Sequence, residues 1–208
     1  GTTTNQTAIM TMTADQQEHR SEEQTQQNSQ SSAVDPVVHD NDNDNDTTQT
    51  KKNVQNRDFA KQEYWEERFA EEESYEWLLS FKELEPFLIP YIQTTDKLLL
   101  VGCGNSDFSA DLYDAGYENI VNIDFSSTVI NRMRAKNSER TMMSWKVMDM
   151  TKMDEFEDDA FDAVIDKAAM DALMTEEGDV WNPNASVVAK ARSMCRHIHR
   201  IVKPNGYH

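Results

Sequence analysis

The sequence predicts an α/β fold in which parallel strands alternate with helices in a doubly wound sheet. Three observations predict it: apolar runs typical of buried strands recur four times, helical stretches separate them, and a glycine or an aspartate follows or ends each run. Crossover helices bring the carboxyl ends of parallel strands to one edge, where ligands bind. The residues at those strand ends are therefore the first candidates for a functional site.

The four expected strands are short runs that carry apolar side chains. They cover residues 97–101, 119–124, 145–148 and 161–165. The residues at their carboxyl ends are Gly102, Asp124, Asp149 and Asp166. The recurrence of such residues at four strand ends is stronger evidence for a ligand site at this edge than any single motif.

The helices are expected where apolar residues recur at helical spacing. They cover residues 57–72, 74–85, 106–115, 126–136 and 184–202. Pro86 predicts the end of the second helix, and Gly116 is typical of the residue after a helix. Ser126 or Ser127 can cap the fourth helix, and the Lys-Pro-Asn-Gly string at 203–206 predicts a turn.

The chain divides into two regions by composition. Residues 1–55 are rich in Thr, Gln, Asn, Ser and Asp and include an alternating Asp-Asn run at 40–46. Such a segment cannot bury enough apolar surface to offset its ordering entropy, so we expect a disordered polar and acidic tail. Residues 56–208 carry the strand and helix patterns and form the expected domain.

The charge distribution restricts the class of partner. The net charge of the chain is −18; residues 1–55 hold nine acidic and three basic residues, so −12 remains for residues 56–208. An acidic surface argues against nucleic acid, because phosphates need a basic footprint. A basic protein partner is compatible with it.

The sequence carries no signal for a membrane segment, for secretion, for disulfides or for a metal site. The sequence has no run of 18 apolar residues, so it predicts no membrane-spanning helix. It has no signal-peptide pattern that would predict secretion. Cys103 and Cys195 form no disulfide framework, and His197 and His199 lie on different faces of their helix, so we expect no metal site. A cytoplasmic location is the expectation.

The strongest chemical signal is the turn after the first strand. Gly102-Cys103-Gly104 between a strand and a helix lets a ligand approach the backbone amides. Asp124 ends the next strand 20 residues after Gly104, where a carboxylate can accept both hydroxyls of a ribose. Together they predict a nucleoside-containing cofactor. The alternative for Asp124 is a turn or helix-capping role.

The flanking residues favour one nucleoside over others. A dinucleotide fingerprint needs a third glycine where Asp107 stands, and a P-loop needs a Gly-Lys-Ser/Thr string that is absent from the sequence. S-adenosyl-L-methionine has no phosphate and carries a sulfonium and an ammonium. Acidic residues around the glycine turn suit such a ligand.

Strings at the strand ends are specific enough for comparison with a family. They are Leu98-Leu99-Leu100-Val101-Gly102-Cys103-Gly104-Asn105-Ser106, Val121-Asn122-Ile123-Asp124-Phe125-Ser126-Ser127, Met148-Asp149-Met150, Phe161-Asp162-Ala163-Val164-Ile165-Asp166-Lys167 and Met170-Asp171-Ala172-Leu173. With Tyr64-Trp65-Glu66-Glu67-Arg68-Phe69 and Tyr75-Glu76-Trp77 upstream, residues 60–206 resemble the class I methyltransferases of the elongation factor 1-alpha lysine methyltransferase 4 and methyltransferase-like 13 family.

The resemblance implies roles for individual residues. The implied cofactor-binding residues are Trp65, Phe69, Trp77, Gly102, Cys103, Gly104, Asp124, Phe125, Asp149, Met150 and Lys167. It implies that the three aromatic residues pack over S-adenosyl-L-methionine and that Gly102 contacts its methionine part. Asp124 then holds the ribose, with Phe125 against the adenine.

The remaining implied roles lie at the later strands. Asp149 accepts a hydrogen bond from the adenine amino group, with Met150 beside it, and Lys167 lies at the floor of the site. No catalytic base is assigned; Asp166 and Asp171 are candidates that orient the amine or steer a basic substrate loop. Alternatives stay open: each aromatic residue can be a core residue, and Asp149 a turn residue.

The chain departs mildly from the family pattern. The family usually has Glu-Lys-Gly-Thr-Leu-Asp at 166–171, where this chain has Asp-Lys-Ala-Ala-Met-Asp, and often Tyr at Phe69 and Phe125. These changes bear on substrate choice more than on cofactor binding.

The resemblance implies an S-adenosylmethionine-dependent protein-lysine N-methyltransferase with a Rossmann-like sheet, acting on a basic protein such as elongation factor 1-alpha. Two alternatives are a small-molecule methyltransferase and a truncated, cofactor-binding form without activity. We expect about four of the family's seven strands, with the fourth strand left as an open edge.

Overall fold

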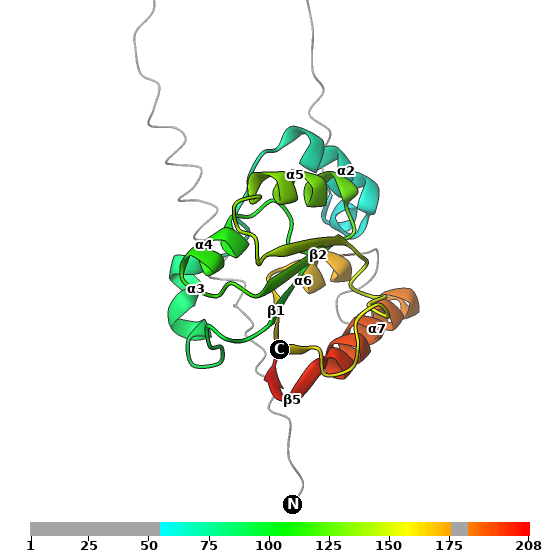
Figure 1. Ribbon diagram of the computed structural model, residues 1–208. Helices are drawn as coiled ribbons and strands as arrows, with labels where there is room; N and C mark the ends of the chain where they lie inside the picture. Colours follow the sequence, from blue (N-terminus) through cyan, green and yellow to red (C-terminus); the bar gives the residue numbers. More distant parts are fainter. Residues whose placement is uncertain (1–54, 176–182) are drawn as a thin grey trace, which may run out of the picture. The chain divides into compact units, whose positions relative to one another are not determined.

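The computed structural model describes residues 55–175 and 183–208 (Figure 1). The predicted tail, except Gln55, lies outside the described residues. Within the described ranges, no helix combines the length and the apolar character needed to cross a membrane.

Five parallel strands form one sheet in the order β3-β2-β1-β4-β5. Their bounds are β1 Leu98–Val101, β2 Ile120–Asp124, β3 Ser144–Val147, β4 Phe161–Asp166 and β5 Val202–Tyr207. Because β1 lies in the middle, between β2 and β4, the chain reverses its winding direction there. The predicted α/β doubly wound sheet is confirmed, and the first four strands lie within a residue or so of their predicted ranges.

Helices cover both faces of the sheet. Their bounds are η1 Asn56–Ala60, α2 Gln62–Glu71, α3 Phe81–Leu88, α4 Phe108–Asp114, α5 Ser127–Lys136, α6 Ala169–Met174 and α7 Ala185–Ile201. Helices α3, α4 and α5 lie on one side of the sheet and α7 on the other (Figure 1). Their buried side chains belong to two separate core clusters.

The alternation of side chains along β1 explains this division. Leu98 and Leu100 point to the cluster shared with α4 and α5, whereas Leu99 and Val101 point to the cluster shared with α7. All four side chains are at most 5% exposed. A strand covered on both faces reads as a continuous apolar run, which is why the sequence predicted β1 so clearly.

The expected N-terminal helices differ from the observed ones. The expected helix over 57–72 is divided into η1 and α2 at Lys61, and residues 72–80 contain no helix. A capping box between Ser80 and Glu83 starts α3 at Phe81, seven residues after the predicted start. Pro86 lies inside α3 instead of ending it, and α3 stops two residues later.

The C-terminal end also corrects the prediction. The expected turn at 203–206 lies within β5, which pairs with β4 through Phe161 opposite Val202 and Ala163 opposite Tyr207. Asn205 has a φ of +74°, and a Cβ on Gly206 would lie 2.5 Å from the Asp162 carbonyl oxygen. The turn residues therefore form an irregularity in a strand. Within residues 55–175 and 183–208 the sheet has five strands and β4 is paired on both sides, so the predicted open edge at the fourth strand was wrong.

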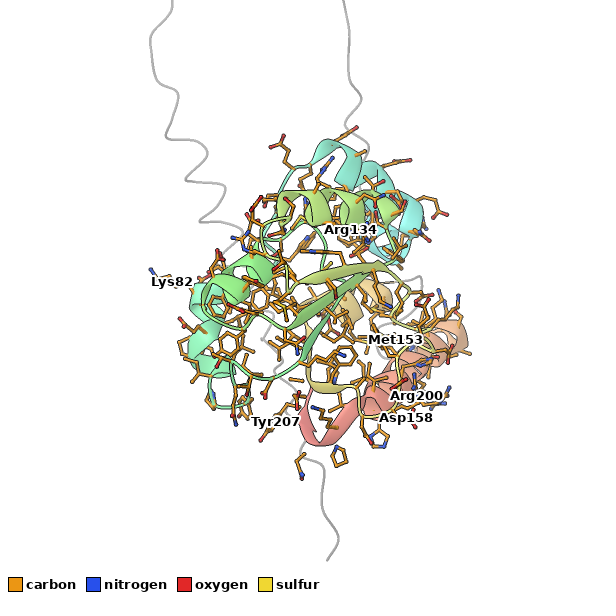
Figure 2. The ribbon with its side chains drawn as sticks, viewed as in Figure 1. Lys82, Arg134, Met153, Asp158, Arg200 and Tyr207 are labelled. Carbon is orange, nitrogen blue, oxygen red and sulfur yellow. The ribbon has the colours of Figure 1, made fainter. Side chains whose placement is uncertain are left out.

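The loop before β4 is tied to the end of α7. The Arg200 guanidinium donates to the carbonyl oxygens of Phe156 and Met153 at 2.7 and 2.9 Å, and to an Asp158 carboxylate oxygen at 2.8 Å. Figure 2 shows Arg200 and Asp158 next to each other at this end of the molecule. These bonds fix the loop that leads into β4 against the end of α7.

Candidate cofactor site at the carboxyl edge of the sheet

The glycine turn after β1 has the backbone conformation that the sequence suggested. Gly102 and Gly104 have φ values of +59° and +53°, a region that favours glycine. A Cβ on Gly102 would lie 2.4 Å from the Ala169 Cβ, so the turn packs directly against the start of α6. Cys103 between them is half-buried, and desolvation raises the pKa of its thiol well above the usual value.

Asp124 lies against this turn. Its Oδ2 accepts the Gly104 N–H at 3.0 Å and its Oδ1 accepts the Ser126 N–H at 2.9 Å. Burial raises the pKa of Asp124 to about 6, although the two backbone hydrogen bonds oppose the shift. Asp124 therefore has the turn role of the alternative, and each carboxylate oxygen keeps further acceptor capacity for a ligand.

The aromatic residues of α2 cover the same turn. The Phe69 side chain is 2% exposed, and its ring lies 3.6 Å from where a Cβ on Gly104 would stand. Trp65 stacks on Phe69 with 5.4 Å between ring centroids, and its Nε1 donates to the Phe59 carbonyl. Phe69 is thus a core residue, as the alternative has it, and also covers the predicted cofactor site.

Trp77 completes this aromatic group from the segment after α2. Its ring meets Trp65 edge to face at 5.8 Å. The Arg68 guanidinium lies 5.0 Å from the Trp77 ring and 4.8 Å from the Tyr75 ring, and binds the Glu72 carboxylate through two nitrogens. These contacts fix the aromatic side chains beside the sheet edge.

Lys167 connects that segment to β4. Its Nζ donates to the Glu76 carboxylate and, at 2.6 Å, to the Trp77 carbonyl oxygen. Glu76 also accepts the Ser106 hydroxyl at 2.8 Å. Burial lowers the pKa of Lys167, and Glu76 opposes this shift. These hydrogen bonds therefore hold residues 72–80 beside the carboxyl ends of β1 and β4.

The two catalytic candidates occupy different environments. Asp166 accepts the Ala169 N–H at 2.9 Å and the Met170 N–H at 3.2 Å, so it caps α6. Burial raises its pKa to about 6, and Asp171 adds to the shift. Asp171 is exposed on α6. Because the Asp166 carboxylate is bound by the backbone, it is better suited to fixing the loop after β4 than to moving a proton.

The predicted site residues that follow β2 and β3 contact parts of the chain other than the glycine turn. The Asp149 Oδ1 accepts the Thr151 N–H at 2.8 Å and its hydroxyl at 2.7 Å, as the turn alternative predicts. Met150 packs against the core cluster of the α7 face. Phe125 is half-buried, and its carbonyl oxygen accepts the Gln62 side chain at 2.9 Å. The adenine contacts of Phe125, Asp149 and Met150 stay predictions.

Comparison with known proteins decides the family. Residues 99–208, just over half of the chain, match the family model described as a methyltransferase domain. The chain belongs to the methyltransferase domain family. Among the residues that the structure describes, this methyltransferase domain holds no group of three His, Cys, Asp or Glu side chains suited to a metal ion.

Named relatives refine the likeness. The chain is 45% identical over 125 residues to the eEF1A lysine and N-terminal methyltransferase of Bos taurus, covering 59% of this chain and 18% of that protein. It is 30% identical over 159 residues to the EEF1A lysine methyltransferase 4 of Mus musculus, covering 75% of this chain and 61% of that protein. The predicted resemblance is confirmed, although the chain spans only part of each relative.

A solved structure is also similar. It is a SAM-dependent methyltransferase of Methanosarcina mazei, with 21% identity, a TM-score of 0.46, and coverage of 57% of this chain and 53% of that chain.

Four polar residues near the carboxyl edge of the sheet were not among the predicted site residues: Glu66, Glu72, Glu76 and Asn105. Glu66 and Glu76 stand inside the strings that carried the resemblance, but only the aromatic neighbours were given a role. The signal for Glu66 was its position on the same face of α2 as Phe69, which a helical projection shows.

Asn105 bears on whether the edge suits a ligand. Its side chain is 1% exposed and its Nδ2 donates to the Glu72 carbonyl oxygen at 3.2 Å. Its Oδ1 is the buried side-chain polar atom that lacks a partner within the described ranges. An unsatisfied buried acceptor beside Gly104 fits a ligand that donates hydrogen bonds, as an ammonium does.

Proposed function

We propose that this methyltransferase domain transfers a methyl group from S-adenosyl-L-methionine to a lysine side chain of a basic protein, with elongation factor 1-alpha as substrate. The observation that carries the cofactor part is the glycine turn, where the Gly104 N–H donates to the Asp124 carboxylate and the Phe69 ring lies against Gly104. The names of the relatives support the substrate part.

The residues of the edge suit each part of the cofactor. Asp124 would accept hydrogen bonds from the ribose hydroxyls, and Phe125 would pack against the adenine. The aromatic group of Trp65, Phe69 and Trp77 would cover the ligand, and rings attract a cationic sulfonium. The acceptors near the turn, Asp124 and the Asn105 Oδ1, favour a ligand with donors over a pyrophosphate.

When bound, the cofactor would supply a methyl group on its sulfonium: a neutral amine would attack the methyl carbon while the carbon–sulfur bond breaks and the thioether leaves. The protein aligns the amine with the methyl group and excludes water. Deprotonating a lysine with an ordinary pKa near 10.4 costs about 4.6 kcal/mol at pH 7. Aromatic walls lower that cost by disfavouring the ammonium. Asp166 and Asp171 can steer a cationic side chain toward the edge, and no residue is assigned as a base.

Methylation of purified elongation factor 1-alpha tests the proposal. With labelled cofactor, mass spectrometry should find added methyl groups on lysine. The value of kcat/KM should rise about tenfold per pH unit until the substrate pKa is passed, because only the neutral amine attacks. Label on a small metabolite alone, with none on any protein of a cell extract, would favour the small-molecule alternative.

Cofactor binding is tested separately by calorimetry with S-adenosylhomocysteine and NAD. We expect S-adenosylhomocysteine to bind more tightly, and Asp124→Ala to remove most of its affinity. Binding without turnover would support the alternative of an inactive cofactor-binding form. A cytoplasmic location stays a prediction, which cell fractionation checks.

A further inference from the structure

We propose that Glu66 is a positioning residue for the nucleoside half of the cofactor: from α2 it holds the loop between β2 and α5, so that Asp124 and Phe125 face the ligand. The inference rests on the proposed use of S-adenosyl-L-methionine. It assigns α2 a task beyond covering the site with aromatic rings.

Glu66 binds the start of α5 through both carboxylate oxygens. It accepts the Ser126 hydroxyl at 2.8 Å, the Ser127 N–H at 2.9 Å and the Thr128 N–H at 3.3 Å. The first N–H groups of a helix have no partner within the helix and carry a partial positive charge. Glu66 satisfies two of these groups from another helix, while Ser126 accepts the Val129 N–H from within α5.

A second side chain of α2 grips the same loop. Gln62 lies one helical turn before Glu66 and donates its Nε2 to the Phe125 carbonyl oxygen at 2.9 Å. Gln62 therefore binds the loop at Phe125, just after β2, and Glu66 binds it where α5 begins. Figure 1 shows α2 lying beside α5, as their contacts require.

The charge of Glu66 matters as well as its shape. Although burial acts to raise it, hydrogen bonds from Thr128, Ser126 and Ser127 bring the pKa of Glu66 below its ordinary value. The ionised Glu66 in turn contributes to the raised pKa of Asp124. Two carboxylates so placed repel each other, and the N-terminus of α5 between them offsets that repulsion. Such an arrangement favours a defined positioning role over a solvated surface charge.

A positioning role predicts a particular pattern of binding. Glu66 acts on the loop that faces the nucleoside, and it does not act on the methyl group. Its loss should therefore weaken every ligand that contains the nucleoside by the same factor. The rate of methyl transfer at saturating cofactor should change little.

Calorimetry on the full chain tests this with S-adenosylhomocysteine and 5′-methylthioadenosine, which lacks the amino-acid end. We expect Glu66→Ala to raise both Kd values by roughly tenfold, a common cost for a charged hydrogen-bond network. Glu66→Gln keeps the shape and loses the charge, so its effect should be intermediate. Glu63→Gln, which removes a carboxylate from the exposed face of α2, is the matched control and should stay within twofold.

Steady-state kinetics provide the second measurement. In Glu66→Ala the KM for S-adenosyl-L-methionine should rise with the Kd while kcat stays within about threefold. Equal Kd values in the wild type and in both Glu66 variants would overturn the positioning role and leave the cofactor proposal standing. A loss confined to S-adenosylhomocysteine would also overturn it, because the effect would then lie at the amino-acid end. Failure of the wild type to bind either ligand would overturn both proposals. Should Glu66→Ala fail to fold, Glu66→Gln decides.

Discussion

Single residues at the sheet edge hold backbone and offer ligand contacts at the same time. Asp124 joins the turn after β1 to the start of α5 through its two backbone hydrogen bonds. Asp166 joins the end of β4 to the start of α6 by accepting the Ala169 N–H. Both carboxyl groups have a pKa raised to about 6, chiefly by burial. Their protonation therefore changes in a range where cofactor binding can be measured.

The affinity for S-adenosylhomocysteine should fall as the pH drops through about 6. The ionised Asp124 accepts from the ribose hydroxyls, and protonation removes part of that capacity, so Kd should rise up to about tenfold per pH unit below the pKa. The titratable groups facing Asp124 are Glu66, with a lowered pKa, and Cys103, with a raised one. Neither titrates in this range.

Calorimetry from about pH 5 to pH 8 measures this dependence. Asp124→Asn should flatten it, whereas Asp166→Asn should leave it in place. A pH dependence that survives Asp124→Asn and disappears in Asp166→Asn would assign the titration to the other carboxyl group.

Ala168 is one of the positions at which this chain departs from the family pattern, and its backbone conformation gives that departure an energetic cost. It has a φ of +72°, in the left-handed region, at the position where the family usually has glycine. A Cβ in this region costs about 1–2 kcal/mol, partly offset by the greater chain entropy of glycine. Ala168→Gly should therefore stabilise the domain by about 0.5–1 kcal/mol.

Urea denaturation measures the effect of Ala168→Gly. The control is Ala172→Gly within α6, which should lower stability by about 1 kcal/mol because glycine disfavours a helix. The two variants make the same chemical change with opposite expected signs. A lower urea midpoint for Ala168→Gly would contradict the strain at this position.

At the scale of elements, the N-terminal segment is held on the sheet edge by glutamates. Glu66 binds the start of α5, Glu72 accepts from Arg68 and Asn105, and Glu76 joins Ser106 to Lys167. The segment 72–80 has no helix of its own, so these contacts supply much of its order.

Removing Glu76 should destabilise the domain by about 1–3 kcal/mol, because Lys167 is left as a largely buried charge with one fewer partner. The Lys167 side chain is 13% exposed and that of Glu76 is 31% exposed. In the double variant Glu76→Ala/Lys167→Met, part of the loss should return. Glu73→Ala, an exposed change in the same segment, should stay within about 0.5 kcal/mol.

Denaturant titrations of the wild type, Glu76→Ala, Lys167→Met and the double variant give the coupling between Glu76 and Lys167. Additive losses, with the double variant the least stable, would mean that the two side chains do not act as a pair.

At the scale of the whole molecule, the parallel sheet gathers the ends of β1, β2 and β4 at one edge, and residues 56–208 carry a net charge of −12. A basic protein substrate would be attracted over distances comparable to the Debye length, which is about 10 Å at 0.1 M salt. The whole charge distribution would thus contribute to the encounter with the proposed basic substrate.

The KM for elongation factor 1-alpha should rise several-fold as salt increases from about 0.05 to 0.3 M, because screening weakens this attraction. The Kd for S-adenosylhomocysteine, a small ligand held by short-range contacts, should change by less than about twofold. Kinetics and calorimetry in the same buffers measure both. A substrate KM independent of salt would exclude a large electrostatic contribution.

The sequence alone determined the alternation of strands and helices and the candidate edge. Each buried strand is an apolar run, and Gly102, Gly104 and Asp124 stand where such strands end. These signals are local: they depend on composition and spacing within a few residues, so they can be read without the fold. The methyltransferase family resemblance rested on the same strings.

Only the tertiary structure decided how the segments far apart in sequence meet. The bonds from Ser126 to Glu66 and from Lys167 to Glu76 span 60 and 91 residues. A helical projection places Glu66 on the face of α2 that carries Phe69, but no local pattern identifies the distant helix that it caps. The Pro-Asn-Gly string of β5 likewise has the composition of a turn, and it forms a strand because β4 offers an edge to pair with. Val202 and Tyr207, on either side of that string, are paired with Phe161 and Ala163 of β4, so pairing with a distant segment outweighed the local turn preference.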